Sequence, residues 1–514
     1  MKKMILTVFA TSLLFSCSIC FLPASFIGED SIKLLFSTIS FFSFRLFIMA
    51  DECIPILEWP PPDHHEVEDE EQTAIPIPKV NDYDIEETPS KKIKFEFDYP
   101  LADISLARWL KRNLELKKKY KLENIKNPRT LINTISGTEE GKAFLRKEIQ
   151  SLMSSEDHFK NDPNYYYVLT TYYDKLHYLE SSMANISKCL KLFHEEMTDI
   201  FGLELRQYLA ELAQLTDFQK NVLWLHQKLL LEQEMTSQGA GLQETEREGE
   251  VEVSSYSAMT EEKFSSLCHS RTPVLLTEVP RPTDQPWTLE HIRTMAGDMK
   301  VEVKRKVEGS TEWAGLEVAE VKTVSQFLED GREEEYLFDW SLPLHCPQLS
   351  EEFRVPPLLE DNILTSTTSH AQYRNSWPSL FIAKAGTHSG LHIDAFGSHF
   401  WMYLFSGEKR WTFYPPETAG RLGPTFYSSL DPVFPPGPDL PSLPSYSLTL
   451  LPGQLLFVPA GAPHRVENIS DTIAVSANLV NQSNIGLATK YFKINALLDP
   501  RTEDLLHELS NLIK

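Results

Sequence analysis

The chain has 514 residues, which at roughly 150 residues per domain suggests about three structural units. Its 42% hydrophobic and 11% aromatic residues are enough to build cores, so wholesale disorder is excluded. With 49 basic and 73 acidic residues, the net charge of −24 argues against a protein that coats duplex DNA and gives no strong sign of nucleic-acid binding. A protein or peptide partner, a basic one in particular, suits this charge better.

The first 48 residues are hydrophobic and admit two interpretations. Residues 4–27 carry no charge and follow two lysines, which is typical of a secretory signal or of a bilayer-spanning anchor. The alternative is a non-native extension of a soluble protein that starts near Met49. Asn468 begins a glycosylation sequon close to His464, and a glycan there would crowd a candidate site, which favours the soluble form. A cytoplasmic or nuclear localisation is therefore favoured, and membrane association or the secretory pathway is expected only if residues 1–48 are retained.

The next segments differ sharply in composition. Residues 49–99 are acidic and proline-rich, which predicts a disordered region. Residues 100–235 repeat apolar side chains at steps of three and four, which predicts a helical domain whose apolar stripes form its core. Residues 236–252 mix glycine with charges of both signs, which is typical of a linker.

From residue 253 the chain contains short apolar runs bounded by Pro and Gly, which predict strands and a jelly-roll barrel over residues 253–495. The clearest runs are 273–276, 301–304, 380–383, 411–414 and 455–458. Residues 496–514 return to helical spacing and predict a C-terminal helix. The predicted fold class is α+β, with a β-barrel preceded by a mostly helical domain.

A His-x-Asp pair, His392 and Asp394, is the first candidate for chemistry. On a strand, residues two apart face the same side, so the imidazole and the carboxylate can point at one position. His464 follows a predicted strand and a tight turn, and it is the third candidate ligand. Two histidines and one carboxylate form the ligand set of non-haem Fe(II) oxygenases. His388 and His399 lie nearby and are rival candidates.

Lys409 directly follows residues 406–408, a glycine-containing segment that looks like a hairpin turn into a new strand. A lysine ammonium there, with a hydroxyl partner, could bind the distal carboxylate of a 2-oxo acid through a charge-assisted hydrogen bond. Ser389, Ser476 and Asn478 are the candidate polar partners. The alternative interpretation of Lys409 is a lysine on the surface of a strand.

Two segments, 392–416 and 452–464, together resemble the JmjC domain of Fe(II)/2-oxoglutarate dioxygenases, most closely the small JmjC hydroxylases. The resemblance covers roughly residues 253–495 and implies a cupin-like form of the barrel. It implies that three residues hold Fe(II) and act in catalysis: His392, Asp394 and His464. It also implies that 2-oxoglutarate and O2 are co-substrates, and that four residues bind 2-oxoglutarate: Lys409, Ser389, Ser476 and Asn478.

The resemblance further implies an oxidoreductase that hydroxylates a side chain of a protein substrate. One alternative is demethylation of methyl-lysine or methyl-arginine, which is less favoured because the six dispersed cysteines form no chromatin-reading zinc module. A second alternative is a non-catalytic scaffold with an inactive barrel. A zinc cupin isomerase is a third, although such an enzyme would not need Lys409.

Overall fold

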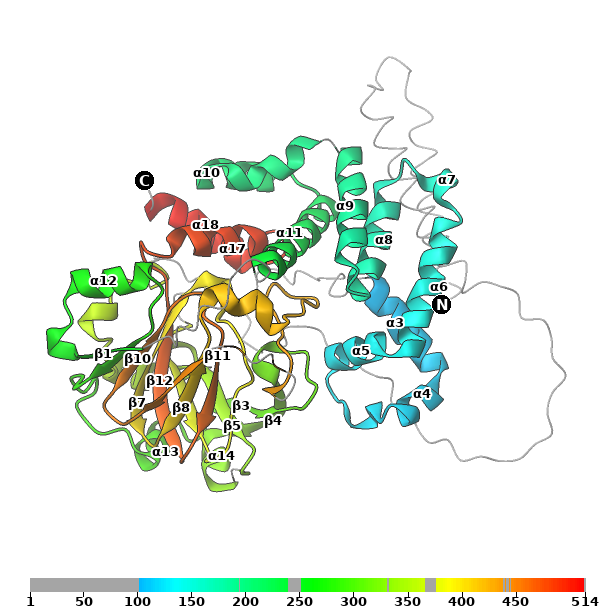
Figure 1. Cartoon of the computed structure of the whole chain (residues 1–514). Helices are drawn as coiled ribbons and strands as arrows, with labels where there is room; N and C mark the ends of the chain where they lie inside the picture. The colour runs from blue at the N-terminus through cyan, green and yellow to red at the C-terminus, as the bar shows by residue number, and fades with distance from the viewer. Residues whose placement is uncertain are drawn as a thin grey trace, which may run out of the picture. The chain divides into compact units, whose positions relative to one another are not determined.

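The computed structural model describes residues 101–193, 195–238, 251–330, 332–365, 376–437, 440, 443 and 445–512. The predictions for residues 1–48 and 49–99, and for most of the linker at 236–252, lie outside these ranges. Within them, a helical region precedes a β-rich domain, so the predicted α+β fold class is confirmed (Figure 1). Among the described helices, none combines the length and the apolar character that crossing a membrane requires.

The helical region begins several of its helices with side-chain caps. The Asn127 side chain accepts hydrogen bonds from the N–H groups of Arg129 and Thr130, and Pro128 occupies the first turn of the helix. Asp162 and Pro163 begin a later helix in the same way. The elements are α3 (Leu101–Arg112), α4 (Leu114–Lys119), η2 (Leu122–Asn124), α5 (Pro128–Gly137), α6 (Glu139–Met153), α7 (Glu156–Phe159), α8 (Pro163–Lys175), α9 (Leu179–Phe193), η3 (Glu195–Gly202), α10 (Leu205–Leu212) and α11 (Asp217–Gln238).

The strands form two sheets, and each of the five predicted apolar runs overlaps a strand. The larger sheet has the order β1-β2-β10-β7-β12-β6-β5-β3-β4, and the smaller has the order β11-β8-β9. The pairs are antiparallel except β1 with β2. The strands are β1 (Glu252–Ser255), β2 (Val274–Thr277), β3 (Lys300–Lys306), β4 (Leu316–Thr323), β5 (Tyr336–Ser341), β6 (Ser379–Ala383), β7 (His399–Ser406), β8 (Lys409–Phe413), β9 (Tyr446–Leu450), β10 (Leu455–Val458), β11 (His464–Asn468) and β12 (Thr472–Leu479).

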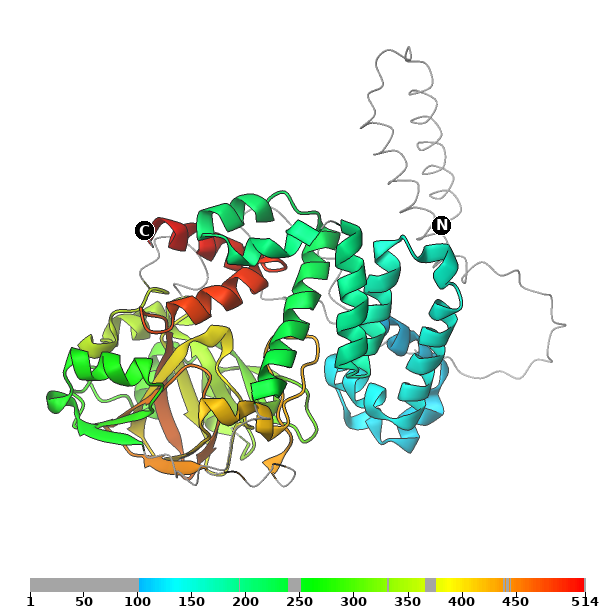
Figure 2. The same cartoon turned by 45° about the horizontal axis from the view of Figure 1, so that its top comes forward.

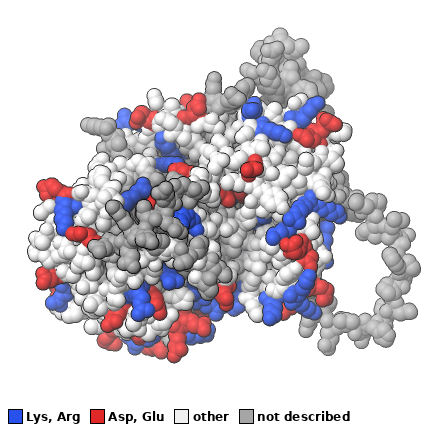
Figure 3. Space-filling model, viewed as in Figure 1, with Lys and Arg blue, Asp and Glu red and all other residues white. Residues whose placement is uncertain are grey.

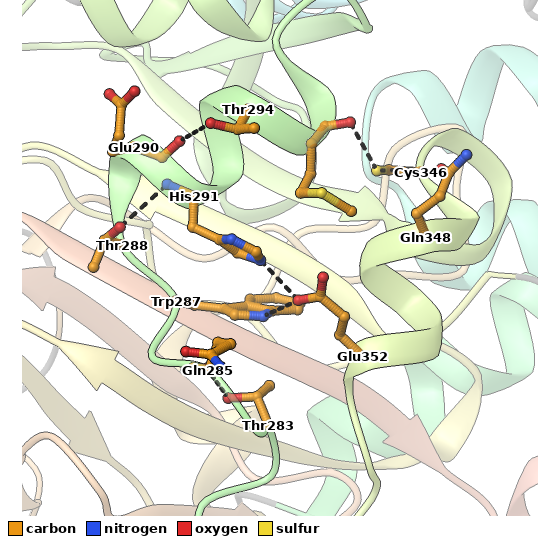
Figure 4. Close-up of polar contacts among 11 residues, drawn as sticks. Thr283, Gln285, Trp287, Thr288, Glu290, His291, Thr294, Cys346, Gln348 and Glu352 are labelled. Atoms are coloured by element: carbon orange, nitrogen blue, oxygen red, sulfur yellow. Dashed lines mark hydrogen bonds and ion pairs between the residues drawn. The ribbon is translucent and has the colours of Figure 1, made fainter.

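Short helices surround the strands. Glu352 joins two of these helical segments, because its carboxylate accepts a hydrogen bond from Trp287 Nε1 (3.0 Å) and contacts His291 Nε2 (2.7 Å), as Figure 4 shows. These elements are η4 (Tyr256–Ala258), α12 (Glu261–His269), α13 (Leu289–Ala296), η5 (Trp313–Gly315), α14 (Val324–Asp330), α15 (Leu342–His345), α16 (Pro347–Glu352), η6 (Pro357–Leu359), η7 (Ala395–Gly397) and η8 (Pro416–Leu422). The chain then ends in two longer helices, α17 (Ile485–Ala496) and α18 (Pro500–Leu512).

The two faces of the larger sheet pack against different partners. On β7, Trp401 belongs to a core that includes Ile292 of α13 and Phe327 of α14. The next residue, Met402, points the other way and packs with Trp411 of the smaller sheet. Successive side chains of a strand point to opposite faces of the sheet. One face therefore packs against helices in an outer core, and the other faces the barrel interior, which both sheets enclose.

The turn at Gly407 does not form a hairpin, so that interpretation of the sequence is wrong. β7 and β8 belong to different sheets, and the chain crosses from the larger to the smaller at this turn. Gly407 has φ of +84°, and a Cβ on it would lie 2.1 Å from the carbonyl oxygen of Asp471. Glycine is required here by both the backbone conformation and the close approach.

The C-terminal residues form two helices, and these helices complete the core of the helical region. Phe492 of α17 and Leu505 of α18 share one buried cluster with Leu190 of α9 and Leu229 of α11. Figure 2 shows α17 and α18 beside α10 and α11, and the Tyr208 hydroxyl donates a hydrogen bond to the carbonyl of Lys493.

Candidate metal centre

The three predicted ligands come together at one point. Donor atoms of His392, Asp394 and His464 all lie within 4.8 Å of one another. His464 begins β11, whereas His392 forms an isolated bridge to it through two backbone hydrogen bonds of 2.9 Å. The strand predicted across His392 and Asp394 is thus reduced to a single bridge. The two side chains still face one side because the backbone remains extended at Asp394, with φ −65° and ψ 142°.

Both imidazole rings are oriented by backbone carbonyls. His392 Nδ1 lies 2.7 Å from the carbonyl oxygen of Gly390, and His464 Nδ1 lies 3.0 Å from that of Ala462. A proton on each Nδ1 satisfies these contacts and leaves each Nε2 lone pair available to a metal. His464 Nε2 lies 3.9 Å from Asp394 Oδ2.

Burial sets the protonation of the three groups. It lowers the pKa of His464 to about 4 and that of His392 well below its usual value, so both rings are neutral. Burial, with the nearby carboxylates of Asp339 and Asp431, raises the pKa of Asp394 to about 8. A bound divalent cation would displace the proton of Asp394 and stabilise its ionised carboxylate. Two neutral imidazoles and one carboxylate therefore fit Fe(II).

Lys409 lies in the barrel interior, which excludes the interpretation of a surface lysine. Its side chain is 0% exposed, and its ammonium donates hydrogen bonds to Asn468 Oδ1 (2.6 Å) and to the Tyr336 hydroxyl (3.1 Å). Desolvation lowers its pKa to about 7. A bound carboxylate would restore the charged form by direct pairing.

Tyr336 and Asn468 are site residues that the sequence reasoning missed. Asn468 is 0% exposed and donates to Thr387 Oγ1 (2.9 Å), which leaves no room for a glycan. A pattern in the sequence could have revealed it: Asn468 follows His464 by four positions on β11 and therefore faces the same side. Tyr336 comes from β5 and has no comparable local pattern.

Two buried polar atoms on strands of the barrel have no hydrogen-bond partner among the described residues. They are Trp411 Nε1, two positions along β8 from Lys409, and Ser476 Oγ on β12. An unpaired buried polar atom costs about 1–3 kcal/mol, so a ligand that paired with these atoms would be stabilised. Trp411 lies on the same face of β8 as Lys409, so its Nε1–H is the one placed beside the buried ammonium.

The other predicted co-substrate residues have protein partners. Ser389 Oγ accepts a hydrogen bond from the Val466 N–H (3.2 Å), and Asn478 Nδ2 donates to Ser398 Oγ (2.6 Å). A role in binding 2-oxoglutarate stays a prediction for Ser389, Ser476 and Asn478, and Ser476 is the one whose hydroxyl is unpaired.

The rival histidines lie apart from the three ligands. His388 is exposed, and its Nδ1 lies 3.4 Å from the carbonyl oxygen of Gly386. His399 is buried in the outer core of β7, where its ring nitrogens contact Ser483 Oγ (2.8 Å) and the Ala460 N–H (2.9 Å). Neither histidine belongs to the ligand cluster.

A cleft of about 600 Å³ opens beside the site. Tyr336, Thr387 and Ser389 line it next to the buried lysine pocket. The acidic and basic residues that line the cleft are Glu308, Glu312, Glu333, Glu334, Lys306 and Arg465. Figure 3 shows both signs of charge over the described residues of the face in view.

Comparison with known proteins matches residues 260–483 to the family model of the cupin-like domain. The chain is 26% identical over 247 residues to lysine-specific demethylase JMJ21 of Arabidopsis thaliana, which covers 44% of this chain and 25% of that protein. It is 27% identical over 160 residues to 2-oxoglutarate and iron-dependent oxygenase JMJD4 of Gallus gallus, covering 30% of this chain and 37% of the relative. It is 35% identical over 114 residues to human HSPB1-associated protein 1, covering 20% and 22%.

The chain thus aligns with less than half the length of each of these relatives. The matched region contains His392, Asp394, Lys409 and His464, and the relatives include 2-oxoglutarate and iron-dependent oxygenases. Residues 260–483 are therefore a cupin-like domain with distant homology to JmjC demethylases and to the JMJD4 oxygenases.

Proposed function

We propose that the protein is an Fe(II)- and 2-oxoglutarate-dependent dioxygenase that hydroxylates a side chain of a protein substrate. The observation that carries this proposal is the cluster of His392, Asp394 and His464 in a barrel that also buries Lys409. A metal site alone would not need a buried ammonium, whereas a co-substrate with a distal carboxylate would.

The three ligands would bind the metal, and Lys409 would bind the co-substrate. Bound together, Fe(II) and 2-oxoglutarate would supply O2 activation and transfer of one oxygen atom to a C–H bond, with release of succinate and CO2. The three ligands would hold the metal from one side and leave its other positions open. Lys409 would bind the distal carboxylate, and its burial strengthens that pairing by excluding water.

The cleft supports a substrate with a basic side chain. Glu308, Glu333 and Glu334 are exposed along its lining. A lysine or arginine of the substrate would be attracted to this negative field. We expect Glu333→Gln with Glu334→Gln to raise the KM for a basic peptide while succinate formation without the peptide stays unchanged.

Removal of an N-methyl group from lysine or arginine is the second candidate. Two relatives are named lysine-specific demethylase JMJ21 and arginine-specific demethylase JMJ20. Oxygen transfer to an N-methyl carbon gives an unstable product that loses formaldehyde, so the same residues would serve both reactions. Mass spectrometry of a modified peptide separates them, because hydroxylation adds one oxygen and demethylation removes a methyl group.

The proposal is tested by following succinate formed from 2-oxoglutarate by the purified protein with Fe(II). We expect turnover in the natural protein and its loss in His392→Ala, with the exposed His158→Ala as the matched control. Folding of each variant is checked by circular dichroism. Absence of iron-dependent succinate formation in the natural protein would overturn the proposal in favour of a scaffold or a cupin isomerase.

A further inference from the structure

The loop between β3 and β4 touches the segment that carries two of the metal ligands. The Trp313 ring packs edge-on against His392, with 4.5 Å between ring centroids. Trp313 Nε1 donates a hydrogen bond of 2.9 Å to the carbonyl of Ile393, the residue between His392 and Asp394. The Gly390 N–H donates to the carbonyl of Ala314 at 2.6 Å. Two hydrogen bonds therefore fix residues 390–394 to this loop.

The loop adopts a conformation that needs external support. Ala314 has φ of +56° and Gly315 has φ of +62°. The left-handed conformation costs about 1–2 kcal/mol for a residue with a side chain, so contacts elsewhere must hold Ala314 in it. Val307 and Gly315 close the base of the loop with one hydrogen bond of 3.0 Å.

Helix α5 of the helical region supplies contacts to the far side of this loop. Asn127 Nδ2 donates to Glu312 Oε1 (3.2 Å), and Asn133 Nδ2 donates to Thr311 Oγ1 (2.8 Å). Thr130 Oγ1 donates to Glu317 Oε1 (2.7 Å) at the start of β4. The N-cap of α5 and two side chains of the helix thus bind two residues of the β3–β4 loop and one residue of β4.

A buried ion pair fixes α5 in turn. Lys175 of α8 donates to Asn133 Oδ1 (2.6 Å) and pairs with Asp103 of α3 (2.5 Å). The side chains of Lys175 and Asp103 are only 6% and 5% exposed. Loss of one partner from such a buried pair is strongly unfavourable, so this part of the helical region is a rigid support.

We propose that the helical region positions the metal ligands through this loop. Helix α5 holds the loop by Thr130 and Asn133, and Trp313 holds the backbone carbonyl between His392 and Asp394. Thr130, Asn133 and Trp313 are positioning residues, since none belongs to the ligand cluster. The inference rests on the metal site of the proposed function but not on the reaction that follows.

Co(II) binding to the full-length protein tests the proposal, because the d–d absorption of Co(II) reports ligand geometry without turnover. Trp313→Phe keeps an aromatic ring beside His392 but loses the Nε1–H donor. Removing an outer hydrogen bond to a metal site typically weakens metal binding 10- to 100-fold, so we expect about tenfold weaker Co(II) binding and an altered spectrum. Trp340→Phe is the matched control, because Trp340 Nε1 donates to the Lys300 carbonyl (3.3 Å) in the outer core.

A second pair of variants tests the contribution of α5. Thr130→Val removes the hydrogen bond to Glu317, whereas Thr134→Val removes one to the Thr130 carbonyl within the helix. We expect weaker Co(II) binding only in Thr130→Val. Equal Co(II) binding in Thr130→Val and Thr134→Val would overturn the contribution of α5. If Thr130→Val does not fold, Thr311→Val, which removes the acceptor of the Asn133 hydrogen bond, takes its place.

The outcomes separate this inference from the proposed function. Co(II) binding and spectra in Trp313→Phe that match the natural protein would overturn the positioning role. A natural protein that binds Co(II) but forms no succinate would overturn the proposed function, while a weakened Trp313→Phe would still support the positioning role.

Discussion

Lys409 and Arg410 are neighbours in the sequence with opposite environments. Alternation along β8 turns Lys409 into the barrel and Arg410 to the surface, where Arg410 pairs with Glu467 at 3.3 Å. The pair therefore offers a comparison in which two cations differ mainly in the direction that they face.

The first prediction concerns co-substrate affinity. Lys409→Met should weaken apparent binding of 2-oxoglutarate about 10- to 100-fold, because a hydrogen bond to a charged group contributes about 1.5–3 kcal/mol. Metal binding should persist, since Lys409 is not a ligand. Arg410→Met is the control and should bind normally. Succinate formation measured against 2-oxoglutarate concentration checks both variants, and an equal effect at Arg410 would contradict the assignment.

A pH dependence follows from the same residue. Burial lowers the pKa of Lys409 to about 7, so above that pH the free protein loses the ammonium that a carboxylate needs. Binding must then take up a proton, and apparent affinity should fall by up to about tenfold per pH unit as the pH rises. Titrations on either side of pH 7 test this in the natural protein and in Lys409→Met, where the pH dependence should be weaker.

Individual residues were predictable where a local pattern carried them. The His-x-Asp spacing, the turn before His464 and the glycine turn before Lys409 are all visible in the sequence. Tyr336 and Trp313 are not, because strand pairing and loop packing bring them to the site from distant positions. The role of Ser389 stays a prediction: its Oγ accepts a hydrogen bond from the N–H of Val466 and retains its own O–H donor.

At the scale of elements, strand register assembles the site. β8 and β11 pair so that Lys409 lies opposite Asn468 and Phe413 opposite His464. Because side-chain direction alternates along β8 and β11, Lys409 and His464 both point into the barrel interior. The apolar runs in the sequence predicted the strands but not their pairing, because a two-residue turn can join paired strands or carry the chain from one sheet to another, as it does at Gly407.

The crossing at Gly407 gives a stability prediction. Gly407→Ala and Gly453→Ala both place a side chain at positive φ, +84° and +80°. Only at Gly407 would the new Cβ meet other atoms, 2.1 Å from the Asp471 carbonyl oxygen and 2.7 Å from Thr472 Cγ2. We expect Gly407→Ala to lower the free energy of unfolding by about 1–3 kcal/mol more than Gly453→Ala does. Urea denaturation of the two variants measures this difference, and equal losses would count against the clash.

At the scale of the whole molecule, the helical region and the C-terminal helices share one core. That cluster contains Leu106 near one end of the described chain and Leu509 near the other. The change of periodicity in the sequence shows where helices give way to strands. It does not show that α17 and α18 return to the first helices, because local spacing records which face is apolar and not what covers it.

Phe492 tests this shared core. It is 0% exposed and belongs to the cluster with Leu190 of α9 and Leu229 of α11. Phe492→Ala should lower the free energy of unfolding by about 3–5 kcal/mol and raise amide exchange in α9 and α11, far away in the sequence. Phe264→Ala is the control, because Phe264 lies in the separate outer core of the large sheet and its loss should raise exchange there first. Hydrogen exchange followed by mass spectrometry resolves these segments. Unchanged exchange in α9 and α11 of Phe492→Ala would mean that the C-terminal helices do not stabilise the helical region. The contacts of α5 with the β3–β4 loop and β4 would then remain as a described link between the helical region and the barrel.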